Sequence, residues 1–147
     1  MAWRAQFFGH TSSHGAAHLH RAVMEGVAFA SRRNIELMKS GGNRLDRVVA
    51  AAGGAKTNLW LEIKAGIYDC PILIPSEAEC GVLGCATLAG LSAGLYSELR
   101  ATVSRLVQYD REILANPDWV DRYRKMQSVF DALYESSRRF WDRLDEL

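Results

Sequence analysis

The sequence is poor in cysteine and in long hydrophobic runs, and each scarcity excludes a class of protein. Its 147 residues include three cysteines, Cys70, Cys80 and Cys85, with no pair spaced C-x-x-C. An odd number of cysteines without a C-x-x-C pair is typical of reduced thiols rather than of a disulfide framework, so we expect a cytoplasmic protein. No apolar run approaches the roughly 20 residues of a membrane-spanning helix, and the first residues lack a signal-peptide pattern.

An excess of charge of one sign is also missing. Eighteen basic and seventeen acidic residues leave a formal net charge of +1. A surface so nearly neutral gives no electrostatic reason to expect nucleic acid or an anionic membrane as a partner. With 48% hydrophobic and 24% charged residues, residues 1–147 are instead typical of one soluble domain that can bury a core.

The most informative stretch is a glycine turn between an apolar run and a helix. Residues 48–52, VVAAA, are uncharged and predict a buried strand. Gly53 and Gly54 supply backbone freedom and remove side-chain bulk, so that a ligand can approach the main chain. Thr57 or Asn58 can cap the next helix, whose free N–H groups favour an anion. The turn is neither a Walker loop nor G-x-G-x-x-G, so alone it is compatible with a tight turn or a nucleotide site.

The remaining pattern predicts a helix-rich α/β fold. Helices are expected over residues 14–40, 58–68, 82–95, 97–107 and from 117 nearly to the end. A second short strand, residues 72–74, lies between two prolines, which favours a sheet edge or a strand start. The two strands and the helix between them predict a right-handed, parallel β-α-β unit.

Two helices carry further expectations. Gly26 lowers helix propensity by roughly 1 kcal/mol, so we expect another element to pack closely against it. Residues 82–95 are small and apolar, and predict a helix buried on the sheet. Ser97 is expected to cap the helix that follows this one.

The last helix carries large apolar and aromatic side chains at alternating steps of four and three. This spacing is compatible with a coiled-coil dimer or with packing along the domain itself, and the bulk of the side chains favours the second. A non-catalytic association module that uses residues 117–144 is therefore the alternative function. The series is Trp119, Tyr123, Met126, Phe130, Leu133, Ser137, Phe140 and Leu144.

Two clusters of polar residues invite a chemical interpretation. His14 and His18, at i and i+4, could share a metal, but helix-start histidines commonly cap or face solvent. Glu77 and Glu79 could act as acid and base, or match the charge of the next helix N-terminus. We favour the structural interpretation of both clusters and predict no metal site, with a zinc site as a third hypothesis. Its ligands would be His10, His14, His18 and His20.

Three segments, in this order, resemble the FGGY carbohydrate kinases. Residues 18–29, HLHRAVMEGVAF, are similar to the family helix H-L-x-R-A-x-x-E-G-x-A-F. Residues 52–60, AGGAKTNLW, resemble its adenosine turn, and residues 75–86, PSEAECGVLGCA, its segment P-x-x-x-E-x-x-x-L-G-A-A. The terminal aromatic helix also resembles that of xylulokinase-type members.

The resemblance implies both a fold and a function. FGGY kinases have two actin-like, RNase-H-like domains with ATP and sugar in the cleft between them, and this chain resembles only the last part of the second domain. The expected fold is therefore α/β, a partial actin-like ATPase domain that is helix-rich, with a short parallel β-α-β core. The expected function is the nucleotide-binding part of an ATP-dependent, pentulose-type sugar kinase, with ATP and Mg²⁺ as cofactors.

The same resemblance assigns roles to single residues. Gly53, Gly54 and Ala55 are expected to line the nucleotide, and Asn58 to lie at the adenine. Glu79 is expected to hold the turn before the next helix. Because the family's phosphate-binding hairpin and its aspartate base lie in parts that this chain does not match, we predict no catalytic residue and no activity of the chain alone. The aspartates here read as solvated: Asp46, Asp69 and Asp110.

A partial domain would leave part of its sheet and of its apolar surface uncovered, and we expect partners to bind there. The sheet would have a free edge and an exposed apolar face, which predicts self-association or docking on a complementary chain that carries the rest. ATP or ADP is expected to bind here, whereas the sugar would bind only with the missing domain, which also holds most of the residues that select it.

Overall fold

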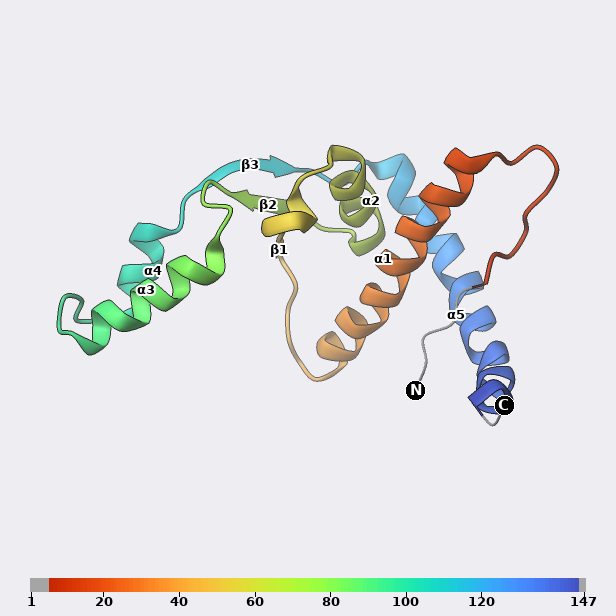
Figure 1. Ribbon diagram of the computed structural model, residues 1–147. Helices are drawn as coiled ribbons and strands as arrows, with labels where there is room; N and C mark the ends of the chain where they lie inside the picture. The colour runs from red at the N-terminus through yellow and green to blue at the C-terminus, as the bar shows by residue number, and fades with distance from the viewer. Residues whose placement is uncertain (1–5, 146–147) are drawn as a thin grey trace.

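The protein's computed structural model describes residues 6–145 and shows a small sheet with helices grouped at its two ends. Figure 1 shows α1, α2 and α5 gathered on one side of the sheet, while the α3–α4 pair extends away on the other. The elements are α1 (Ala16–Ser40), β1 (Val48–Val49), the 3₁₀ turn η1 (Ala52–Ala55), α2 (Asn58–Tyr68), β2 (Ile72–Pro75), α3 (Cys80–Ser92), α4 (Leu99–Leu106), β3 (Tyr109–Ile113) and α5 (Pro117–Asp145).

The sheet has three strands in the order β1-β2-β3. Strand β1 runs parallel to β2, with Val48 opposite Ile72, which confirms the predicted β-α-β unit. Strand β3 runs antiparallel to β2, with Ile113 opposite the same Ile72. The α/β class is therefore confirmed, and the sheet is mixed rather than purely parallel.

Two predictions about the strands are wrong. Of the two positions that the prolines favoured for β2, the sheet edge is wrong because β2 is central, whereas the strand start fits Pro71, which directly precedes the strand; Pro75 ends it where the register with β3 shifts. Strand β1 is shorter than expected and is not covered on both faces, since Val49 is 47% exposed. Strand β3 was not predicted at all, because its residues YDREI are largely polar.

The core centres on α2. Leu61, Ile63 and Ile67 are fully buried there between α1, α5 and the sheet. Gly66 is the position of close approach, because a Cβ at that site would lie 3.1 Å from Cδ2 of Tyr123 on α5. The close approach expected at Gly26 does not occur, since nothing would lie within 4 Å of a Cβ there.

Polar residues of the α1 motif join α1 to α5. Tyr123 donates a hydrogen bond to Oε1 of Glu25 over 2.7 Å. Arg21 donates to the same carboxylate over 2.8 Å and to the Tyr123 hydroxyl over 3.0 Å. Burial and the Glu25 carboxylate together raise the pKa of Tyr123 to about 12. The arginine and the glutamate of the motif thus fix the packing of two helices.

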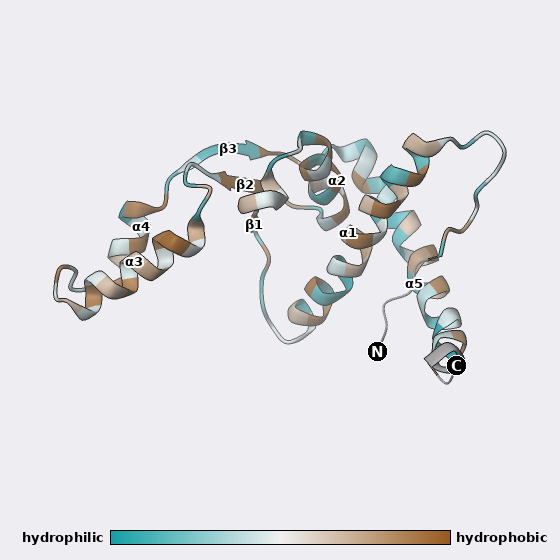
Figure 2. Cartoon of the chain, viewed as in Figure 1, coloured by the Kyte–Doolittle hydropathy of each residue, from teal (hydrophilic) through white to brown (hydrophobic). Residues whose placement is uncertain are grey.

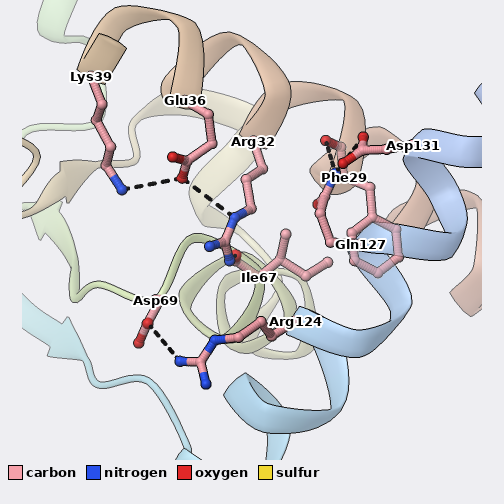
Figure 3. A network of polar contacts seen from close by, with 9 residues as sticks. All are labelled: Phe29, Arg32, Glu36, Lys39, Ile67, Asp69, Arg124, Gln127 and Asp131. Atoms are coloured by element: carbon pink, nitrogen blue, oxygen red, sulfur yellow. Dashed lines mark hydrogen bonds and ion pairs between the residues drawn. The ribbon is translucent and has the colours of Figure 1, made fainter.

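A second polar network closes the far end of α2 (Figure 3). Arg32 of α1 donates to the carbonyl oxygen of Ile67, one of the carbonyls that a helix end leaves free. Asp69 ends α2 in the left-handed conformation, at a φ of 55°, and pairs with Arg124 of α5 over 3.3 Å. The first network therefore joins α1 to α5, and the second joins α2 to both of these helices.

Helix α3 is not buried on the sheet, contrary to prediction. Its two buried residues are Thr87 and Gly90, whereas Val82 is 66% exposed and Leu88 58% exposed. Figure 2 shows hydrophobic residues along α3 in the part of the molecule that stands apart from the core. Its main helical neighbour among the described residues is α4.

The helix ends follow from local chemistry. Asn116 accepts hydrogen bonds from the N–H groups of Asp118 and Trp119, so α5 begins at Pro117 as predicted. Helix α4 is capped by Glu98, not by Ser97, because the Glu98 carboxylate accepts from the N–H groups of two residues in the first turn. In the described part of the chain, no helix combines the length and apolarity needed to cross a membrane.

Candidate functional site

The glycine turn lies where β1 ends and α2 begins. Gly53 is exposed and Gly54 half-buried within η1, while Ala55 packs against the hydrophobic core. Asn58 follows as the first residue of α2. The fold therefore brings the four predicted site residues together, at the carboxyl end of a parallel strand, where α/β proteins commonly bind ligands.

The protein's own backbone requires neither glycine. Within η1 the left-handed conformation belongs to Ala52, at a φ of 53°, and neither Gly53 nor Gly54 has a positive φ. A Cβ at Gly53 would meet nothing within 4 Å, and one at Gly54 would meet only Nζ of Lys64 at 3.5 Å, an ordinary contact. The backbone freedom that the sequence suggested is not used. What the two glycines do provide is main chain without a side chain, exposed at Gly53 and half-buried at Gly54.

The N-terminus of α2 has no side-chain cap. Thr57 holds the N-cap position but accepts no hydrogen bond from the first turn. Asn58 does not cap either, because its Oδ1 accepts from Nη1 of Arg111 on β3, over 2.9 Å. The first N–H groups of α2 therefore have no side-chain acceptor, and such groups favour an anion.

Besides Lys56, which directly follows the turn, two cations from elsewhere in the chain lie near it, and sequence reasoning missed both. Nζ of Lys64 lies 4.4 Å from the ring centroid of Trp60, and burial lowers the pKa of this lysine. Arg111 reaches Asn58 from the other side. Lys64 is one of many surface-type residues in the sequence. Arg111 could not be placed without β3, a strand whose polar sequence gave no signal.

The acidic pair before α3 has a structural role in part. Oε1 of Glu77 accepts a hydrogen bond from the N–H of Glu79 over 2.9 Å, so Glu77 shapes the turn. Glu79, expected to hold that turn, occupies the N-cap position without a side-chain cap bond. The two carboxylates border a shallow, largely apolar hollow of about 230 Å³ with Val82 and Leu83.

The histidine rings near the start of α1 lie close together in tilted and edge-to-face arrangements, and His14 and His18 accept hydrogen bonds from backbone N–H groups. Ring centroids of His10 and His14 lie 5.8 Å apart, and those of His14 and His18 lie 5.2 Å apart. Nδ1 of His18 accepts from the N–H of Gly15, the N-cap residue of α1. This is the capping role that the sequence favoured. Among the residues that the structure describes, no three histidine, cysteine or acidic side chains are grouped to hold a metal ion.

The seam of α5 is used within the chain. Tyr123 is 2% exposed and belongs to the core, and Trp119, Met126 and Phe130 pack against it. Further along, Phe140 is 51% exposed. Most of the described seam therefore packs along the domain, as predicted, and is not free to form a coiled coil. The side chain of Leu144 lies outside the described part.

Comparison with known sequences connects this geometry to one family. The chain matches the FGGY family of carbohydrate kinases, C-terminal domain, over residues 2–93. An autoinducer-2 kinase of Enterobacter is 36% identical over 119 residues, which are 80% of this chain and 22% of that protein. A xylulose kinase of Staphylococcus epidermidis is 27% identical over 136 residues, or 92% of this chain and 27% of the relative.

Solved structures agree with the sequence comparison. The xylulose kinase of Rhodospirillum rubrum superposes with a TM-score of 0.81 at 27% identity, over 93% of this chain and 28% of that one. The glycerol kinase of Plasmodium falciparum, solved with ADP, gives 0.77 at 25% identity, over 92% and 27% of the two chains. The chain thus spans about a quarter of the length of these relatives, and the match includes the glycine turn, α2 and both strands of the β-α-β unit.

Proposed function

The chain belongs to the FGGY family of carbohydrate kinases, and on that premise we propose that it forms the nucleotide-binding part of an ATP-dependent kinase that phosphorylates a pentulose-type sugar. The observation that carries the proposal is the pair Gly53 and Gly54. Neither is required by backbone conformation or by a close neighbour, so main chain without side-chain bulk is what they contribute. The xylulose kinases among its relatives favour a pentulose as the substrate.

The proposed contacts follow from the groups around the turn. The uncapped N–H groups of α2 and the ammonium of Lys64 would meet the phosphates, since both favour negative charge. Asn58 would face the adenine, with its amide oxygen held by Arg111. Ala55 would support the nucleotide from the core side of the turn. ADP in the related glycerol kinase supports a nucleotide as the ligand.

Phosphoryl transfer needs more than this chain supplies. The reaction requires a positioned acceptor, in-line geometry and stabilisation of charge on the transferred group. Asp46 and Asp69 are paired with Arg44 and Arg124 respectively, so neither carboxylate is free of a cationic partner. The chain's own share is to bind and orient ATP, while the sugar and the base would belong to the rest of the kinase.

Magnesium does not fit the groups at this site. Mg²⁺ takes oxygen ligands, mainly carboxylates and phosphates, whereas the charged side chains identified at the turn, Lys56, Lys64 and Arg111, are all basic. In the described residues no group of three potential ligands occurs. The proposed role of this chain therefore involves the nucleotide and not its metal.

Calorimetric titration of the full chain with ATP and with ADP tests the proposal. We expect Gly54→Val to weaken binding at least tenfold, because the side chain would occupy the space of the ligand while its nearest protein neighbour is the flexible end of Lys64. Asn58→Ala should weaken it about fivefold, the effect of roughly 1 kcal/mol in one hydrogen bond. Gly84→Val, a change on α3 where a Cβ meets nothing within 4 Å, is the matched control.

Two results would count against the proposal. Binding that is unaffected by Gly54→Val would make the turn purely structural. Absence of nucleotide binding, both by the chain alone and after the chain is combined with the rest of a related kinase, would remove the nucleotide site altogether.

A further inference from the structure

The side chain of Arg111 on β3 reaches an amide at the start of α2. Side chains on a strand alternate between the two faces of the sheet, so Arg111 shares a face with Ile113, which packs against the hydrophobic core, while Glu112 lies on the opposite face. None of the ion pairs among the described residues includes Arg111. Its hydrogen bond is with the neutral side chain of Asn58.

The chemistry of the two side chains fixes which way this amide faces. A guanidinium carries N–H donors and no acceptor, whereas an asparagine amide has an acceptor oxygen and a donor nitrogen. The 2.9 Å contact therefore joins Nη1 of Arg111 to Oδ1 of Asn58, and the reversed amide would set donor against donor. Since a carbonyl oxygen has two lone pairs, one lone pair of Oδ1 and both N–H groups of Nδ2 stay available for a ligand.

Asn58 is held at its backbone as well. It is the first residue of α2, and the next residue, Leu59, packs against the core, while the Asn58 side chain itself is exposed. The last torsion of an asparagine side chain is broad, so an exposed amide ordinarily turns over. Arg111 removes that freedom. The amide is thus fixed at both ends and presents its acceptor and its donor in one order.

Resting on the proposed function, in which Asn58 faces the base, we propose that Arg111 is a positioning residue that makes the site select adenine over a 6-oxopurine. Adenine offers an N–H donor at position 6 beside a ring-nitrogen acceptor, and Oδ1 and Nδ2 of one asparagine match this pair together. A 6-oxopurine such as hypoxanthine offers an acceptor at position 6, which would meet Oδ1, another acceptor. Turning the amide over would instead set its donor against the donors of Arg111.

ATP and ITP, which carries hypoxanthine, test this role. Calorimetric titration of the full chain, alone and combined with the rest of a related kinase, gives the ratio of the two dissociation constants. We expect the wild type to bind ATP at least about tenfold more tightly than ITP. Arg111→Met, which keeps an unbranched stem but no donor, should bring the two affinities to within about threefold of each other. Arg111→Lys, which keeps a donor, should retain a ratio above about fivefold.

A measurement without ligand tests the contact itself. Nitrogen-15 relaxation of the side-chain NH₂ group of Asn58 reports how freely the amide moves. We expect an ordered amide in the wild type and a mobile one in Arg111→Met. An amide that is equally mobile in both proteins would overturn the inference.

Two further variants serve as controls. Arg105→Met removes the same charge on α4, in the arm that extends away from α1, α2 and α5 (Figure 1), where Arg105 lies over the ring of Tyr96. It should leave the ratio within about twofold of the wild type. In an Asn58→Ala background, Arg111→Met should not change the ratio, because the amide on which it acts is gone. Thermal melting of each variant confirms that it folds.

The alternative roles of Arg111 give different ratios. An arginine that only attracted the phosphates would, when replaced by methionine, weaken both nucleotides equally. One that donated directly to the base carbonyl would favour ITP, so that its loss would raise the preference for ATP. Either result, or a wild-type ratio near one, would overturn this inference and leave the nucleotide site in place. Binding of neither nucleotide, alone or in the combination, would overturn the proposed function and this inference with it.

Discussion

Helices α2 and α3 are both short and apolar, yet the chain treats them in opposite ways. Six of the eleven residues of α2 are buried, between α1, α5 and the sheet, whereas two of the thirteen in α3 are. Helix α2 finds its partners within the chain, and α3 has mainly α4 beside it. The core formed by α1, α2 and α5 can therefore account for the stability of this chain, while the arm formed by α3 and α4 contributes a surface.

The largest expected effect tests this division directly. Leu61→Ala in α2 removes a fully buried side chain and should lower the free energy of unfolding by about 3 kcal/mol. Leu88→Ala in α3 makes the same chemical change at a position that is 58% exposed, and should cost less than about 0.5 kcal/mol. Urea denaturation of both variants measures the difference. Equal costs would show that Leu88 is as well packed in solution as Leu61, which would contradict the division into a core and an exposed arm.

A pair of glycines gives a smaller effect of opposite sign. Gly66→Ala places a methyl group 3.1 Å from the buried ring of Tyr123 and should destabilise the chain by about 1 to 2 kcal/mol. Gly26→Ala meets nothing and should stabilise it by up to about 1 kcal/mol through helix propensity. The midpoint of thermal unfolding should move down for the first and up for the second. Movement in the same direction would contradict the core packing.

These glycines also show where sequence reasoning succeeds and where it fails. Spacing of apolar residues placed α1, α2, α4 and α5, because each of them repeats its pattern along the helix, whereas α3 was placed by its small, apolar composition. Neither signal could tell α2 from α3, since burial depends on what lies opposite. Gly26 was expected to mark a close approach, and Gly66 marks it instead, because the contact with Tyr123 joins residues 57 positions apart in the sequence.

The candidate site was predictable only where its residues are contiguous. Gly53, Gly54, Ala55 and Asn58 lie in one turn, so a local motif could group them. Arg111 reaches Asn58 from 53 residues away, on a strand whose sequence is polar because its edge faces solvent. Long-range polar contacts of this kind leave no periodic signal.

The pH dependence of stability should report on the α1–α5 contact. Burial and the neighbouring carboxylate raise the pKa of Tyr123 to about 12 from the ordinary value of 10. Between these values the unfolded chain loses the phenolic proton while the folded one keeps it, so the free energy of unfolding falls as the pH rises from 10 to 12.

Tyr123→Phe should flatten this fall. At neutral pH it should cost about 1 kcal/mol, because Glu25 and Arg21 lose their partner. Denaturation at several pH values compares the two proteins. An unchanged slope between pH 10 and 12 would assign the titration to other groups.

The last prediction changes no stability and measures only exposure. Cys70 in the core is 6% exposed and burial raises its thiol pKa, whereas Cys85 on α3 is exposed. Because the thiolate is the reactive form, a maleimide should label Cys85 more than tenfold faster than Cys70. Adding the rest of a related kinase should slow labelling of Cys85 if docking covers the arm, and leave Cys70 unchanged. Slowing at both would indicate a general tightening of the chain, while slowing at neither would show that the rest of the kinase does not cover α3.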